Sequence, residues 1–168
     1  MLIGYDLWGF EMLVRMATLE DLERVAQLND DLDLCHVSYH PLYRLKENAS
    51  ELSLAHIKDK IEKSTSGDGL VLVAQDKDIV GFLDNCSIKD QNPNAEIQKI
   101  GHIGLVYVIP AYRRRGIATA LIKEALKWLK ERKVEYVELN VVVQNAAAIA
   151  AYTAMGFKPN QRNLIKKL

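Results

Sequence analysis

Three consecutive arginines and a glycine separate an apolar stretch from an amphipathic helix, and this junction is Arg113-Arg114-Arg115-Gly116. Acidic residues usually occupy the first turn of a helix, where the helix dipole is positive, yet the first acid here is Glu124. Unpaired backbone amides, the dipole and nearby guanidinium groups together favour a bound anion. Gly116 and Ala118 leave the backbone uncovered, so a phosphate can approach it closely. The junction therefore predicts a phosphate-binding turn between a strand and a helix, with a solvated basic turn as the alternative.

The spacing of apolar residues along the rest of the chain predicts one α+β domain spanning residues 1–168. Strands are expected at residues 13–16, 70–74, 79–83, 100–109 and 137–143. A last extended segment is expected to start at residue 157 and to resume at 164–165. Helices are expected after an N-cap at Thr18, at 52–63, at 117–131, and after an N-cap at Asn145. Residues 29–50 carry the least regular pattern. Residues 1–11 are expected to form either an added strand or a loose arm.

Composition narrows the class of protein. Basic and acidic residues number 22 each, so the formal net charge is zero, whereas a general nucleic-acid binder usually carries a basic excess. No apolar stretch approaches the ~20 residues that span a bilayer, and the N-terminus lacks the pattern of a signal peptide. Two cysteines, Cys35 and Cys86, could form one disulfide, but so few cysteines in a chain of this length favour a reduced intracellular pair. We therefore expect a cytoplasmic protein that binds neither nucleic acid nor membrane.

Two short patterns in the second half of the chain resemble those of the GNAT acetyltransferase superfamily. The phosphate-binding pattern of that family is Arg or Gln, two residues, Gly, one residue, then Gly or Ala, and here it is Arg113-Arg114-Arg115-Gly116-Ile117-Ala118. The second pattern here is Asn145, Ala148, Tyr152, Gly156 and Phe157. Both occur in the order of the family, separated by one helix and one strand. The resemblance implies the GNAT fold, an α/β/α layered domain whose mixed, mostly antiparallel sheet is splayed by a bulge.

The resemblance also implies a site for acetyl-CoA. The pyrophosphate would lie on the junction, at Arg113, Arg114, Arg115, Gly116, Ile117, Ala118 and Thr119. The pantetheine arm would pair with the preceding strand at Val106, Tyr107 and Val108, and the Val108 amide would face the thioester oxygen. Asn145 would contact the pantetheine, cap its helix, or do both. No metal is expected, because the spacing of His36 and His40 suits a metal but no third ligand is near in sequence.

Two residues are candidates for proton transfer. Tyr152 is the usual general acid of the family, and its alternative role is that of a buried aromatic between helix and sheet. Because a free tyrosine has a pKa of ~10 and a thiol ~8.5, Tyr152 would act chiefly as a hydrogen-bond donor to sulfur. Several family members carry a glutamate as general base eleven residues before the position of Arg113, and His102 stands there in this chain. A histidine without chemistry is the alternative, and Glu96 is the second candidate base.

Together these residues predict an N-acetyltransferase that transfers an acetyl group from acetyl-CoA to an amine by direct attack in a ternary complex. The alternative is a CoA-binding or sensor module of the same fold without turnover. The acceptor, a small molecule or a peptide or protein, is not determined by these patterns. Asp30, Asp31 and Asp33 lie on the side that usually lines the acceptor, where they either attract a cationic amine or are simply solvated. A homodimer is left open.

Overall fold

The computed structural model describes residues 2–7 and 10–167, with side chains from Met12 onward. Within these residues one sheet contains β1 (Leu2–Leu7), β2 (Phe10–Met16), β3 (Leu70–Gln75), β4 (Ile79–Asp90), β5 (Lys99–Ile103), β6 (Val106–Val108) and β7 (Val137–Leu139). The α-helices are α1 (Leu22–Val37), α2 (Ala49–Ser66), α3 (Ile117–Glu131) and α4 (Ala146–Ala154). The sequence-based expectation of an α+β domain is confirmed.

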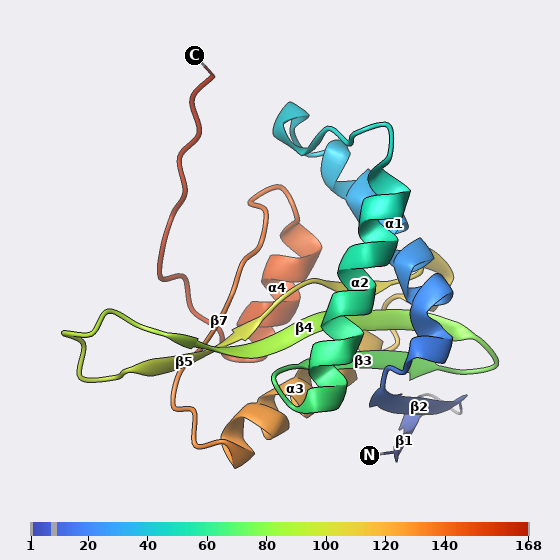
Figure 1. The fold of residues 1–168 in the computed structure, drawn as a ribbon, viewed down its shortest axis with the longest axis horizontal. Helices are drawn as coiled ribbons and strands as arrows, with labels where there is room; N and C mark the ends of the chain where they lie inside the picture. The colour runs from blue at the N-terminus through green and yellow to red at the C-terminus, as the bar shows by residue number, and fades with distance from the viewer. Residues whose placement is uncertain (1, 8–9, 168) are drawn as a thin grey trace.

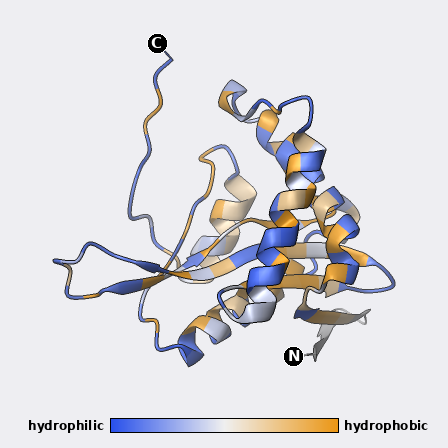
Figure 2. Cartoon of the chain, in the orientation of Figure 1, coloured by the Kyte–Doolittle hydropathy of each residue, from blue (hydrophilic) through white to orange (hydrophobic). Residues whose placement is uncertain are grey.

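The sheet is mostly antiparallel and lies between two layers of helices (Figure 1). Its order is β1-β2-β3-β4-β5-β7, with β6 also pairing with β4, and only the β5–β7 pair is parallel. Successive side chains of β3 point to opposite faces of the sheet and contribute to two hydrophobic cores. Leu70 and Leu72 pack toward α3, whereas Val71 and Val73 pack toward α1 and α2. Figure 2 shows the apolar residues gathered in this central part of the sheet, while the β4–β5 hairpin is hydrophilic toward its tip.

The N-terminal segment contains the strand β1. Residues 2–7 pair antiparallel with β2, in register from Leu2 opposite Arg15 to Leu7 opposite Phe10. Of the range 1–11 for which the two alternatives were weighed, residues 1, 8 and 9 lie outside the described residues.

The first helix is longer than its apolar pattern indicates. Thr18 begins the helical region as expected, since its amide donates to Asp21 Oδ2 at 2.8 Å. However, α1 continues to Val37 through the stretch that was expected to be irregular, because Leu32 extends the buried face one turn beyond Leu28. The three aspartates at 30, 31 and 33 therefore lie on a helix.

Two predicted extended segments are shorter or absent. β7 ends at Leu139 rather than at 143, since its partner β5 ends opposite it at Ile103 and leaves no strand to pair with. Residues 157–167 form no strand, so the expected last extended piece is wrong; Leu164 is 89% exposed and has no core to pack against. In Figure 1 this segment runs away from the sheet to the C-terminus.

A bulge interrupts the regular pairing in the middle of β4. Between Leu83 and Cys86 this strand advances three residues where its neighbour β3 advances two, so β4 carries one extra residue at Asp84–Asn85. Leu83 and Cys86 consequently both pack toward α3, although residues three apart in an unbroken strand face opposite sides. The Asp84 side chain is directed to the other face, toward α2.

The next strand follows this bulge. The segment expected as one strand, 100–109, is divided into β5 and β6 by Gly104–Leu105. Its register with β4 is the same before and after the interruption, because two residues separate the paired segments on each strand. The sheet is thus splayed by a bulge, as expected, and the bulge extends across two strands. We call Asp84–Asn85 and Gly104–Leu105 together the paired bulge.

Candidate active site

The amides that open α3 form the first part of the candidate site. Gly116 is the N-cap with φ 78°, no side chain caps the helix, and its first turn contains no acid. The Ala120 amide donates to Gly116 O at 2.9 Å, so the amides of residues 117–119 have no acceptor inside the helix. Arg114 is also left-handed, with φ 65°, and left-handed residues in a turn can gather backbone amides into an anion-binding concavity. This backbone geometry suits a phosphate or diphosphate.

Two of the three arginines brace the turn. Arg113 Nε donates to Val108 O at 2.9 Å, and Arg115 Nη2 donates to Ala111 O at 3.1 Å. Each guanidinium also lies over an aromatic ring, at 5.5 Å and 4.9 Å respectively. These contacts orient the loop backbone, while Arg114 is exposed between them. The amides are therefore the part of the turn best arranged for an anion.

One edge of β6 is open. Within the described part of the chain β6 pairs only with β4, because β7 pairs with β5 and stops there. The Ile109 amide donates to Val80 O at 2.9 Å, so the odd-numbered residues of this stretch direct their backbone groups toward β4. By alternation, the amides of Val106 and Val108 face the open edge. An extended group can add to such an edge as a strand does.

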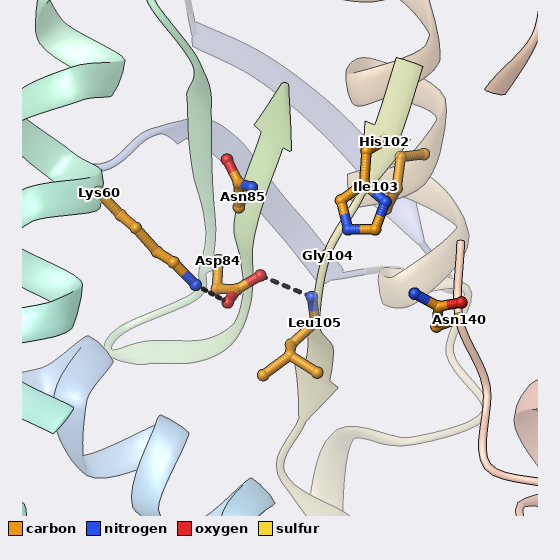
Figure 3. Close-up of a pocket in the computed structure, with 8 residues that line it drawn as sticks. All are labelled: Lys60, Asp84, Asn85, His102, Ile103, Gly104, Leu105 and Asn140. Carbon is orange, nitrogen blue, oxygen red and sulfur yellow. Dashed lines mark hydrogen bonds and ion pairs between the residues drawn. The ribbon is translucent and has the colours of Figure 1, made fainter. Parts of the chain in front are cut away.

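An open pocket of ≈230 Å³ lies at the start of β6, and its lining residues are Lys60, Asp84, Asn85, His102, Ile103, Gly104, Leu105 and Asn140. Figure 3 shows that they come from α2, from the two strands of the paired bulge and from the segment after β7. Lys60 Nζ is hydrogen-bonded to Asp84 Oδ2, and Asp84 Oδ1 accepts from the Leu105 amide at 2.6 Å. The pocket thus combines an ion pair, a histidine and two amide side chains.

Of the two candidate bases, His102 is the one that lines this pocket. Its side chain is 13% exposed, and Nδ1 lies 3.2 Å from Oε1 of Glu138, its partner in the β5–β7 register. This contact orients the ring, and Nε2 is the ring nitrogen that Glu138 does not contact. Glu96 lies in the exposed loop that joins β4 to β5, away from the pocket lining.

Tyr152 and Asn145 both belong to α4. Asn145 Oδ1 accepts from the Ala148 amide at 3.1 Å, so the predicted N-cap is confirmed. Tyr152 is partly buried, packs edge-on against Phe157 at 6.1 Å, and belongs to the core cluster that includes Val106 and Ala118. Burial raises the pKa of the Tyr152 hydroxyl above its ordinary value. Tyr152 therefore packs on the side of the sheet that α3 covers.

Sequence patterns did not identify Lys60, Asp84, Asn85 or Asn140 as residues of the pocket. For Asp84 a signal exists: it is an acidic residue directly after the apolar run 79–83, inside a strand. Asn85 directly follows Asp84 in the same strand, whereas Lys60 and Asn140 carry no such signal, since a polar residue on a helix or in a loop is ordinary.

Other polar residues singled out in the sequence have local roles. His40 Nδ1 accepts from the Leu42 amide at 3.1 Å, and His36 packs near the rings of Tyr39 and Tyr43. Among the described residues no three potential ligands gather into a metal site, and no helix there is long and apolar enough to cross a membrane. Cys35 and Cys86 are both free thiols, as expected, and burial raises the pKa of Cys86 to about 12.

Comparison with known proteins identifies the class. The sequence model of the Acetyltransferase (GNAT) family matches residues 26–157, so the chain belongs to this family. It is 30% identical over 151 residues to an N-alpha-acetyltransferase of Sulfurisphaera tokodaii, covering 89% of this chain and 82% of that protein. It is 26% identical over 115 residues to an aminoglycoside N(6')-acetyltransferase type 1 of Acinetobacter haemolyticus, covering 67% and 79%.

The fold agrees with this assignment. A solved structure of an aminoglycoside N-acetyltransferase in complex with CoA superposes with a TM-score of 0.72 at 18% identity, covering 95% of this chain and 96% of that one. The protein is an acetyl-CoA-dependent N-acetyltransferase, and the alternative of a non-catalytic module is not favoured.

Proposed function

We propose that this enzyme acetylates the α-amino group at the N-terminus of a peptide or protein, by direct attack on acetyl-CoA in a ternary complex. The observation that carries the proposal is the open edge of β6, which joins the amide turn of α3 to the pocket at the paired bulge. The amides of residues 117–119 would hold the pyrophosphate, and the open edge would receive the pantetheine arm. The acetyl group would then lie beside the pocket, where an amine can reach it.

In this proposal three groups of the site each contribute to one part of the reaction. The Val108 amide donates to the thioester oxygen as negative charge develops there. His102 accepts a proton from the acceptor's ammonium group through Nε2, so that the neutral amine attacks, while Glu138 holds Nδ1 at 3.2 Å. Tyr152 donates a hydrogen bond to the departing sulfur, and its pKa, raised by burial, keeps the phenol protonated at neutral pH.

Charge near the pocket favours a peptide over a polycation as acceptor. A second pocket of ≈320 Å³ adjoins the first along α2, because His56 lines it one helical turn before Lys60. Its charged lining contains Arg44 and Lys46 but only one carboxylate, Asp33. In the first pocket Lys60 and Asp84 neutralise each other. A polycation such as an aminoglycoside would therefore meet no net negative surface.

The acceptor is tested by intact-mass analysis after incubation with acetyl-CoA. The acceptors are a peptide with a free N-terminus and no lysine, the same peptide blocked at its N-terminus with an internal lysine, and an aminoglycoside. We expect one acetyl group on the first peptide and little on the other two. An α-amine has a pKa of ~8 and is neutral about one time in ten at pH 7, far more often than a lysine with ~10.4. Acetylation of the aminoglycoside alone would contradict the proposed acceptor.

Replacing His102 by glutamine should lower kcat/KM for the free-N-terminus peptide about tenfold at pH 7, because that is the factor gained by deprotonating an amine of pKa ~8. The loss should shrink toward pH 9, where the amine is already neutral in solution. The measurement is a pH–rate profile of the wild type and the variant. Glu96→Gln is the control and should follow the wild type. A pH-dependent loss in the control instead would assign the base to Glu96.

A further inference from the structure

Asp84 occupies the bulged position of β4 and bonds across to the neighbouring strand with both its backbone and its side chain. Its amide donates to Leu105 O at 3.0 Å, and its Oδ1 accepts from the Leu105 amide at 2.6 Å. In a regular antiparallel pair the carbonyl of residue 84 would accept this second bond. The bulge displaces that pattern, since the Gly104 amide donates to Asn85 O at 2.7 Å. The carboxylate therefore replaces the backbone acceptor that the bulge removes.

The second carboxylate oxygen is held by Lys60 from α2. Asp84 has a side chain only 2% exposed, and that of Lys60 is 17% exposed. A carboxylate this buried needs both an ion-pair partner and a hydrogen-bond donor to offset its desolvation, and Asp84 has both. Figure 3 shows the resulting chain of contacts, which runs from α2 through Asp84 to the backbone at Leu105.

Gly104, on the strand opposite Asp84, has no side chain that would collide with this carboxylate. A Cβ atom at Gly104 would overlap Asp84 Oδ1 and would stand 3.2 Å from Asn85 O. Only glycine therefore leaves room for the carboxylate to reach the Leu105 amide. The paired bulge is thus built from an acid on one strand and a glycine on the other.

We propose that Asp84 is a positioning residue for acetyl transfer, which fixes the direction of the open edge of β6 through its two bonds to Leu105. Leu105 directly precedes β6, and the Val108 amide lies three residues further on. A rotation of the backbone at Leu105 would turn the amides of Val106 and Val108 away from the pantetheine arm and its thioester. The inference rests on the proposed placing of that arm along β6, and it is independent of which amine is the acceptor.

The test compares two double variants that both remove the ion pair, of which only one keeps a side-chain acceptor at position 84. Asp84→Asn with Lys60→Met keeps a side-chain oxygen for the Leu105 amide, whereas Asp84→Leu with Lys60→Met removes it. Calorimetry measures the affinity for acetyl-CoA and for 3′-phospho-ADP, the nucleotide part that contains the diphosphate but no pantetheine. We expect the Asn variant to bind acetyl-CoA about tenfold more tightly than the Leu variant, the usual factor for one hydrogen bond. The affinity for 3′-phospho-ADP should be equal in the two.

Two results would overturn the proposal. Equal affinities for acetyl-CoA would show that the bond to Leu105 does not position the arm. A parallel loss of acetyl-CoA and 3′-phospho-ADP binding in the Leu variant would show a general structural role. If instead the proposed cofactor site itself is wrong, 3′-phospho-ADP will not bind even to the wild type, and this result distinguishes the two failures.

Gly104→Ala probes the same bond if the Leu variant does not fold. The added methyl group displaces Asp84 Oδ1, so we expect acetyl-CoA binding to weaken about tenfold while 3′-phospho-ADP binding is retained. Gly69→Ala is the matched control, because its added Cβ makes only ordinary contact, 3.4 Å from Cys86 O. Unchanged acetyl-CoA binding by Gly104→Ala would contradict the proposal.

Discussion

Replacing Gly116 by glutamate should weaken the binding of acetyl-CoA at least about 100-fold, or ~2.7 kcal/mol. Two effects add. Gly116 has φ 78°, a conformation that costs other residues ~1–2 kcal/mol, so a glutamate at this position strains the loop backbone of the variant. The carboxylate also projects from the N-cap of α3, where the uncapped amides of residues 117–119 would otherwise hold a phosphate. Isothermal titration calorimetry with acetyl-CoA measures the loss.

Gly67→Glu separates these two effects. Gly67 is also left-handed, with φ 91°, it ends α2, and a Cβ built there meets nothing within 4 Å. This variant therefore carries comparable backbone strain and the same new charge, remote from the turn. It should bind acetyl-CoA like the wild type. Arg114→Gly, which keeps the amides and removes an exposed guanidinium, should lose only about threefold, as for one exposed ionic contact. Near-normal binding by Gly116→Glu would exclude the turn as the diphosphate site.

Replacing Tyr152 by phenylalanine should lower kcat about 100-fold, the lower range for loss of a general acid. The affinity for acetyl-CoA should change little, because the ring and its edge-on packing against Phe157 remain. Only the hydroxyl is lost, and its hydrogen bond matters most when charge develops on sulfur. Single-turnover kinetics together with calorimetry separate the effect on chemistry from that on binding.

The pH dependence sharpens this prediction. Burial raises the pKa of the Tyr152 hydroxyl above the ordinary ~10, so the wild type keeps the phenol protonated up to about pH 9. The ratio of wild-type to variant rate should therefore be constant between about pH 6 and 9. Tyr136→Phe, at a tyrosine that is 64% exposed, is the control and should retain full activity. A kcat of Tyr152→Phe close to that of the wild type would remove the proposed role of this residue.

Local sequence determines those parts of the protein whose residues are neighbours along the chain. The helix α3 follows from its 3- and 4-residue apolar spacing, and the Asn145 N-cap from a side chain that bonds an amide three residues later. The amide turn is equally local, since Gly116 and the acid-free first turn are contiguous. For such features the interacting groups are fixed by backbone geometry alone.

Only the tertiary structure decides the pocket and the extent of the strands. Lys60 and Asp84 are 24 residues apart, and His102 and Glu138 are 36 apart, so no periodicity indicates that they meet. The strand predicted at 100–109 is divided because of an extra residue in β4, and the strand predicted at 137–143 is cut short where β5 ends. The sequence by itself thus determined the helix, the cap and the amide turn. Pairing between distant strands determined the paired bulge, the open edge of β6 and the residues of the pocket, because these depend on register, which is a property of two segments together.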